Sequence, residues 1–128
     1  MPFVKLVTNV PEEKIPQDFN QKFNRLLADI FPGKSYEVFA IDVISNKRYT
    51  FGGTSEPSAM LKITAFHIFS PEKNVKYSKA ICEFLFSTLQ IPGTRILIEF
   101  IDIATCNVGF NSSTVQALID EGNFTTSK

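Results

Sequence analysis

The fold of this 128-residue chain is decided by residues 58–103, which read SAMLKITAFHIFSPEKNVKYSKAICEFLFSTLQIPGTRILIEFIDI. Residues 58–68 are rich in apolar and β-branched side chains and predict a strand. A helix follows, because Ser70 is a preferred N-cap residue and Pro71 suits the first helical position. Residues 95–103 then predict a second long strand. The stretch is therefore a strand–helix–strand unit.

The same unit occurs earlier in the chain. Residues 2–8 and 37–44 predict strands, and a further short strand is expected at Tyr49–Phe51. The helix between the two longer strands is predicted by apolar residues at helical spacing, which are Phe19, Phe23, Leu26, Leu27 and Ile30. Two such units predict an α+β fold, a two-layer sandwich in which both helices cover one face of a four-stranded mixed sheet.

The alternation along the strands distinguishes the two faces of this sheet. One face is purely apolar, as expected under two helices. The other face is also largely apolar, although it carries Lys5, Asp42, Lys62 and Glu99. Because so apolar a face is not expected to remain in water, we predict a homo-oligomer that encloses its sheets. The four charged residues balance in sign and are expected to form ion pairs, either structural pairs at a subunit interface or pairs around a wet central channel.

Composition excludes several classes of function. Thirteen basic and thirteen acidic residues balance, so nucleic acid is not an expected partner. We find no stretch of about 20 apolar residues that would span a membrane and no secretory signal, so the expected location is the cytoplasm. A metal site is not expected from His67, Cys82 and Cys106, the only histidine and cysteines. No phosphate-binding loop or other cofactor motif is present, and no cofactor is predicted.

Pro2 is the residue whose position in the sequence suggests a chemical role. Removal of Met1 would leave a secondary amine at this position. Burial in an apolar pocket and nearby cations lower the pKa of an amine, which suits a base that abstracts a proton next to a carbonyl. A proline that merely begins an edge strand is the alternative, and composition alone favours that alternative.

Six motifs in register favour the catalytic interpretation. They are MPFVKLVTNVP at 1–11, Gly33-Lys34, FGGTSEP at 51–57, YSK at 77–79, RILIEF at 95–100 and NVGFNSST at 107–114. With them the chain resembles the family of macrophage migration inhibitory factor and D-dopachrome tautomerase. The resemblance covers residues 1–115, taken as the tautomerase domain, and leaves 116–128 as a C-terminal extension.

The resemblance implies a homotrimer with an active site at each subunit interface. Pro2 would be the catalytic base of a keto–enol tautomerisation. Lys34 would hold an anionic group of the substrate and lower the pKa of Pro2. The backbone N–H of Phe66 would donate a hydrogen bond to the substrate carboxylate or enolate.

Four further residues complete the implied substrate pocket. Val108 and Phe110 would form an apolar wall, and Leu97 and Glu99 would come from the neighbouring subunit. Glu99 departs from the family, which has Asn or Arg there. An unpaired carboxylate would raise the pKa of the Pro2 amine and repel an acidic substrate, so turnover is expected to be weak unless a lysine neutralises it.

Two functions are compatible with this sequence. The first is a tautomerase acting on small aromatic or enolisable carbonyl compounds of the phenylpyruvate or dopachrome type. The alternative is a cytokine-like protein with a vestigial pocket, secreted without a signal peptide and recognised by a cell-surface receptor. In the extension, Gln116–Glu121 is expected to form a short helix capped by Gly122, which lies over a neighbouring subunit or a pocket rim and is followed by a loose tail.

Overall fold

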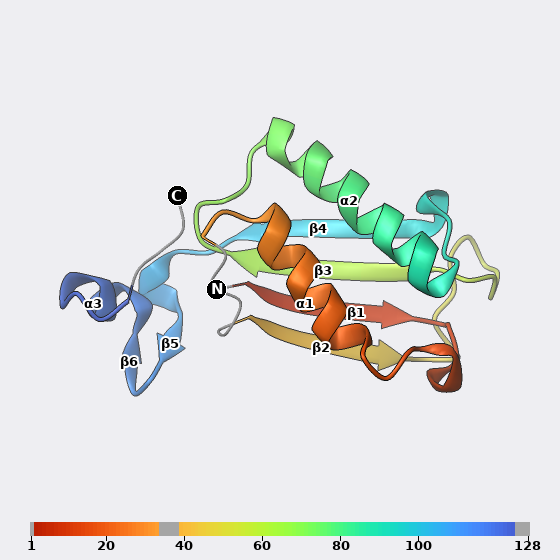
Figure 1. The fold of residues 1–128 in the computed structure, drawn as a ribbon, viewed down its shortest axis with the longest axis horizontal. Helices are drawn as coiled ribbons and strands as arrows, with labels where there is room; N and C mark the ends of the chain where they lie inside the picture. Colours follow the sequence, from red (N-terminus) through yellow and green to blue (C-terminus); the bar gives the residue numbers. More distant parts are fainter. Residues whose placement is uncertain (1, 34–38, 125–128) are drawn as a thin grey trace.

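The computed structural model describes residues 2–33 and 39–124, and it has two layers, a sheet and two helices that cover one of its faces (Figure 1). The main elements are β1 (Phe3–Thr8), α1 (Phe19–Ile30), β2 (Ala40–Ser45), β3 (Ala59–Ala65), α2 (Pro71–Leu89) and β4 (Ile96–Asp102). The strand order is β2-β1-β3-β4. Each strand–helix–strand unit forms a parallel pair, and the central pair β1–β3 is antiparallel. The predicted α+β fold is confirmed.

The smaller elements lie at turns and at the C-terminal end. They are the 3-10 helices η1 (Glu12–Lys14), η3 (Gly93–Arg95) and η4 (Thr105–Asn107), the short strands β5 (Gly109–Phe110) and β6 (Ser113–Thr114), and α3 (Val115–Asp120). In Figure 1, β5, β6 and α3 lie beyond the end of the sheet at which β1 begins. The predicted C-terminal helix is thus present and begins one residue earlier than expected.

The ends of the two long helices follow from local sequence. The Ser70 side chain accepts a hydrogen bond from the Lys73 N–H, with Pro71 at the first position of α2. At the other end, Gln90 adopts the left-handed conformation that closes a helix. The α1 helix ends before Gly33, whose φ of 101° is readily available to glycine.

The core lies between the sheet and the helices. Leu61 and Ile63 of the central strand β3 are fully buried, as are Phe23 of α1 and Ile81 of α2. The Phe23 ring stacks on Phe84 of α2 with ring centroids 5.4 Å apart. Burying one such large apolar side chain contributes about 1.5–3 kcal/mol, so the packing of both helices on this face of the sheet stabilises the fold.

The opposite face of the sheet is open in the single chain. Leu97 and Ile101 of β4 are 55% and 40% exposed. The strand register places Asp42, Lys5 and Lys62 in one row that ends at Glu99. Within this row, Lys62 Nζ lies 3.9 Å from Glu99 Oε1, so one of the expected ion pairs forms inside the chain.

The short strand expected at Tyr49–Phe51 does not form. Phe51 makes only an isolated bridge with Thr54 across a two-glycine turn. The guanidinium of Arg95 donates to the backbone oxygens of Phe51 and Thr54, and it lies 5.3 Å from the centre of the Phe51 ring. These contacts hold the segment as a loop against η3 and prevent it from extending as a strand.

The predicted third strand, 58–68, is shorter in the structure. The third strand ends at Ala65, because His67 has a φ of 55° and turns the chain away from the sheet. The second begins at Ala40 in the structure, and positions 37 and 38 of the prediction lie outside the described residues.

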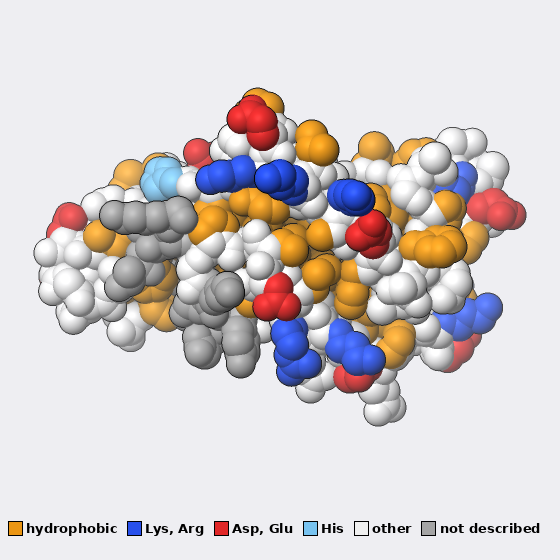
Figure 2. All heavy atoms as spheres, turned by 45° about the horizontal axis from the view of Figure 1, so that its top comes forward, with side chains coloured by type: hydrophobic (Ala, Val, Ile, Leu, Met, Phe, Trp, Pro, Cys, Tyr) orange, Lys and Arg blue, Asp and Glu red, His pale blue; other side chains and the backbone are white. Residues whose placement is uncertain are grey.

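The surface carries both signs of charge. Figure 2 shows Lys and Arg side chains interspersed with Asp and Glu over the visible face, which agrees with the balanced composition. Among the described residues, no helix combines the length and apolar character needed to cross a membrane.

Candidate active site

Pro2 lies at the start of β1 and is fully buried. Its carbonyl oxygen accepts a hydrogen bond from the Ala40 N–H at 3.1 Å, which extends the β1–β2 ladder by one residue. Pro2, the predicted catalytic base, is therefore held in place by a backbone hydrogen bond to the sheet.

A small cavity lies beside Pro2. Its described lining consists of Phe31, Pro32, Phe39, Ala65, Phe66 and Ile68. None of these side chains is charged, so the described side chains around the Pro2 ring are apolar. An amine in such surroundings has a lowered pKa, because burial disfavours its protonated form.

The turn after β3 positions the backbone of Phe66. The next residue, His67, has a left-handed φ of 55°, and its N–H donates to Asp102 Oδ1 at 3.0 Å. On the other side of the turn, the Ile103 N–H donates to the Ala65 oxygen at 3.0 Å. Two contacts with the end of β4 thus fix the turn that presents Phe66 to the Pro2 cavity.

The Phe66 side chain also belongs to a second apolar cluster. It is buried together with Val108 and Val115, and Phe3, Ile103, Ile119 and Phe124 pack against this cluster. Phe66 therefore connects the Pro2 cavity with the C-terminal part of the chain. Val108 is 6% exposed and belongs to this second cluster, and it is not among the described residues that line the Pro2 cavity.

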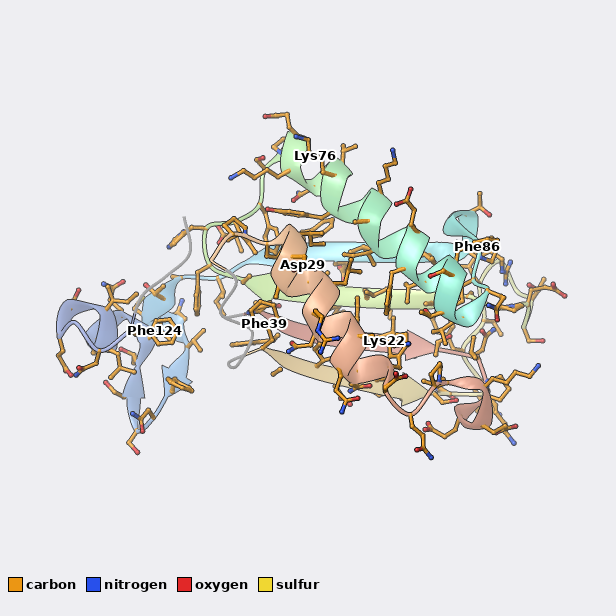
Figure 3. All side chains as sticks on the ribbon, in the orientation of Figure 1. Lys22, Asp29, Phe39, Lys76, Phe86 and Phe124 are labelled. Carbon is orange, nitrogen blue, oxygen red and sulfur yellow. The ribbon has the colours of Figure 1, made fainter. Side chains whose placement is uncertain are left out.

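Phe110 is carried on a tight hairpin. Asn111 and Ser112 both have positive φ, as a two-residue type I′ turn requires, and this turn joins β5 to β6. The ring of Phe110 packs edge to face against Phe124, with centroids 5.8 Å apart and an angle of 73° between the planes. Figure 3 shows Phe124 beside β5 and Phe39 at the end of the sheet where β1 begins.

The chain brings some of the predicted site residues together and leaves others apart. Pro2 and Phe66 line one cavity, and Val108 shares a cluster with Phe66. Leu97 and Glu99 lie on the open face of β4, where their strand partners are Met60 and Lys62. At about 3.3 Å per residue along a strand, Glu99 is some 10 Å from the Asp102 end of β4. Within one chain, these two residues do not reach Pro2.

One predicted site residue cannot be placed. Lys34, the predicted anion-binding residue, lies outside the described residues.

The structure adds aromatic residues that the sequence reasoning missed. Phe31 and Phe39 line the Pro2 cavity, and Phe124 contributes to the second cluster. Phe31 follows the last residue of α1 and Phe39 precedes β2. Large apolar residues at such boundaries are the signal that could have predicted their place beside Pro2. Phe124 was assigned to a loose tail, whereas the structure packs it.

Burial raises the pKa of two side chains, of which Tyr77 contacts the lining of the cavity and Cys82 packs against the main core. The Tyr77 hydroxyl donates to the oxygen of Ile68, a lining residue, at 2.7 Å, and burial raises the pKa of this phenol above its usual value. Burial likewise raises the pKa of the Cys82 thiol, which disfavours a reactive thiolate. In the part of the chain that is described, no three His, Cys, Asp or Glu side chains are grouped as metal ligands would be.

Comparison with known proteins gives one consistent result. The family model described as macrophage migration inhibitory factor matches residues 1–116. The MIF-like protein mif-2 of Caenorhabditis elegans is 36% identical over 115 residues, 90% of this chain and 95% of that protein. The macrophage migration inhibitory factor of Rattus norvegicus is 33% identical over 114 residues, covering 89% and 98%. The solved structure of the factor from Trichinella spiralis aligns with a TM-score of 0.83 at 26% identity, covering 88% of this chain and 98% of that one.

Proposed function

Because the chain belongs to the macrophage migration inhibitory factor family, we propose that it is a keto–enol tautomerase in which the nitrogen of Pro2 is the catalytic base. The observation that carries this proposal is the complete burial of Pro2 beside a cavity whose described lining is uncharged. The alternative, a proline that merely begins an edge strand, is wrong for this chain, because β1 lies between β2 and β3.

Removal of Met1 is a requirement of this mechanism. While Met1 is attached, the Pro2 nitrogen is a tertiary amide and does not accept a proton. Once Met1 is removed, the nitrogen becomes a secondary amine. Burial lowers its pKa toward neutral pH, where a base is most effective in proton transfer.

The proposed reaction moves one proton between carbon and oxygen. The Pro2 amine takes a proton from the carbon next to the substrate carbonyl, which leaves an enolate and a protonated amine. Protonation of the enolate oxygen then gives the enol, and loss of the proton from Pro2 restores the base. The Phe66 N–H, held by the turn that follows β3, is proposed to stabilise the negative oxygen, and Lys34 to hold the substrate carboxylate.

Glu99 is the residue on which the choice between enzyme and vestigial pocket depends. An unpaired carboxylate beside Pro2 would keep the amine protonated and favour the binding protein. In the structure Glu99 is paired with Lys62 at 3.9 Å, which supports the enzyme. The pair is half exposed, so it neutralises Glu99 partially and in a salt-dependent way.

A homotrimer is part of the proposal, because the site is incomplete in one chain. Leu97 and Glu99 lie too far from Pro2 in their own chain and are proposed to complete the pocket of a neighbour. The exposed apolar residues on the open face of the sheet support such an assembly. Its mass in solution should be three times the protomer mass of 14.4 kDa.

The decisive experiment compares the wild type with Pro2→Gly, using D-dopachrome methyl ester and hydroxyphenylpyruvate as substrates. We expect the variant to lose activity by about 100-fold or more, since general-base catalysis contributes on that scale. Mass spectrometry must first show that Met1 is absent from both proteins. Pro16→Gly makes the same chemical change at an exposed position and should keep full activity.

Two results would count against this role of Pro2. Equal rates for wild type and Pro2→Gly would contradict it directly. The pH profile of the wild type should also show a group that titrates below the range of a free secondary amine. An apparent pKa above about 9 would mean that Glu99 dominates the site.

A further inference from the structure

The C-terminal segment 117–124 lies beyond the residues that the family model matches, yet it packs against the proposed site. The contact runs through Phe124, which adjoins the buried cluster of Phe66, Val108 and Val115. Phe66 in turn lines the Pro2 cavity. An unbroken path of apolar side chains therefore connects the extension to the proposed base.

Local hydrogen bonds fix the course of the chain before Phe124. Thr114 caps α3 by accepting from the Ala117 N–H at 3.1 Å. After α3, Gly122 has a φ of 78° and donates to the Ile119 oxygen at 3.0 Å, while the Asn123 N–H donates to the Leu118 oxygen at 2.7 Å. This pair of bonds is the Schellman motif, which turns the chain back over the end of a helix.

The α3 helix is also tied to the preceding segment. The Thr105 hydroxyl donates to Gln116 Oε1, and the Gln116 amide donates to Asp120 Oδ1 at 2.9 Å. The Val115 N–H donates to the Val108 oxygen at 2.9 Å. Phe124 is thus carried by an anchored element, as a residue with a constant binding role requires.

Phe124 and Phe110 together form an edge-to-face aromatic pair that is not fully covered. The Phe110 side chain is 38% exposed, and Phe124 is half-buried. A third aromatic ring placed against such a pair gains stacking or edge-to-face contacts that a saturated ring does not. Phe124 also packs against the buried apolar cluster of Phe66, Val108 and Val115, so the binding contribution proposed for it is apolar and aromatic.

We propose that Phe124 is a specificity-determining residue, which with Phe110 contacts the planar ring of an aromatic substrate whose reacting carbon lies at Pro2. This inference rests on the proposed function, because it places the ring in the tautomerase pocket. It assigns to the extension the selection of aromatic over aliphatic carbonyl compounds.

The test measures binding without turnover. Two carboxylates with the same propenoate chain, cinnamate and (E)-3-cyclohexylpropenoate, differ in whether the ring is aromatic, and neither carries the keto group of a substrate. NMR titrations of the Met1-processed full-length chain should show that Phe124→Ala weakens cinnamate binding about five- to tenfold, the scale of one aromatic pair. The loss for (E)-3-cyclohexylpropenoate should be about twofold or less.

Two matched variants control for structural effects. Phe124→Tyr keeps the ring and should bind cinnamate as the wild type does. Phe86→Ala removes a phenylalanine that is 60% exposed on α2, and Figure 3 places it at the opposite end of the molecule from Phe124. This variant should leave both affinities unchanged.

Three results would overturn the inference. They are wild-type affinity for cinnamate in Phe124→Ala, an equal loss for both ligands, and the absence of cinnamate binding to the wild type. Failure of the proposed function would look different. A wild type that binds cinnamate through Phe124 but turns over substrate no faster than Pro2→Gly would contradict only the tautomerase role of Pro2.

Discussion

The residues that precede β1 and β3 occupy equivalent places at opposite ends of the sheet in the duplicated fold, but their surroundings differ. Pro2 immediately precedes β1, and Ser58 immediately precedes β3, the antiparallel partner strand. Both side chains are fully buried. Beside Pro2 the described lining is apolar, with a small cavity, whereas the backbone of Ser58 is held by polar side chains.

The hydrogen bonds at the Ser58 end show what this difference means. The Ser58 oxygen accepts from the Thr8 hydroxyl at 2.7 Å, and its N–H donates to Asn9 Oδ1 at 2.9 Å. Arg95 closes the adjoining loop by donating to the Pro57 and Glu56 oxygens. Duplication thus supplies two similar positions. At one, polar side chains hold the backbone of Ser58, while its buried Oγ has no hydrogen-bond partner among the described residues. The other is left apolar, where an amine would be a stronger candidate for chemistry.

The largest expected effect comes from removing the hydrogen bonds of Thr8 at the Ser58 end of the sheet. Thr8→Val keeps the size of a fully buried side chain but removes the hydroxyl that donates to Ser58 and accepts from the Val10 N–H at 3.1 Å. Two buried backbone groups would lose their partner, so the free energy of unfolding should fall by about 2–3 kcal/mol. Urea denaturation measures this loss. Tautomerase activity of the folded protein should be unchanged, because the Pro2 end is untouched.

The matched control for this change is Thr8→Ser. It keeps the hydroxyl and removes one methyl group, which should lower the free energy of unfolding by only about 1 kcal/mol. If Thr8→Ser were as destabilising as Thr8→Val, the packing of the methyl group and not the hydrogen bonds would account for the stabilisation by Thr8.

The second expected effect lies at the Pro2 end. Asp102 accepts the His67 N–H at 3.0 Å and so holds the turn that carries the Phe66 N–H. Asp102→Ala should lower kcat about tenfold with a smaller change in KM, because loss of part of an oxyanion contact raises the barrier of the chemical step. Steady-state kinetics with hydroxyphenylpyruvate measures both constants.

Asp102→Asn distinguishes positioning from charge. Its amide oxygen can still accept the His67 N–H, so kcat should stay within about threefold of the wild type. A variant as slow as Asp102→Ala would show that the negative charge matters, and the positioning role would be wrong.

The repeated strand–helix–strand scaffold could be predicted well from the sequence, because the patterns that mark its strands and helix ends involve residues close together in the chain. Alternation marks β1 and β4, and the Ser70 cap with Pro71 marks the start of α2 to the residue. The failures arose where distant contacts decide the structure. Arg95, more than 40 positions along the chain from Phe51, occupies the backbone oxygens of the predicted short strand.

The candidate site shows the same limit. Pro2 and Phe66 were identified by resemblance, and the structure brings both to one cavity. Phe124 was missed, because its packing against Phe110 depends on how α3 folds back and no motif marks it. The proposed contacts of Leu97 and Glu99 with a neighbouring subunit involve a surface that strand periodicity marks as apolar without indicating its partner.

The smallest expected effect concerns Glu99. It tests whether the ion pair on the open face of the sheet affects the pKa of the Pro2 amine. With Lys62 beside it, Glu99→Gln should change kcat/KM by less than about threefold, as for other half-exposed pairs. Lys62→Met should do more. It leaves the Glu99 carboxylate unpaired, which raises the pKa of the Pro2 amine and keeps more of it protonated at neutral pH. The rising limb of the pH–rate profile should therefore move to higher pH, and the double variant with Glu99→Gln should restore it. If Lys62→Met instead left the profile in place, Glu99 would not reach a neighbouring Pro2, and the proposed contribution of β4 to the adjacent site would be wrong.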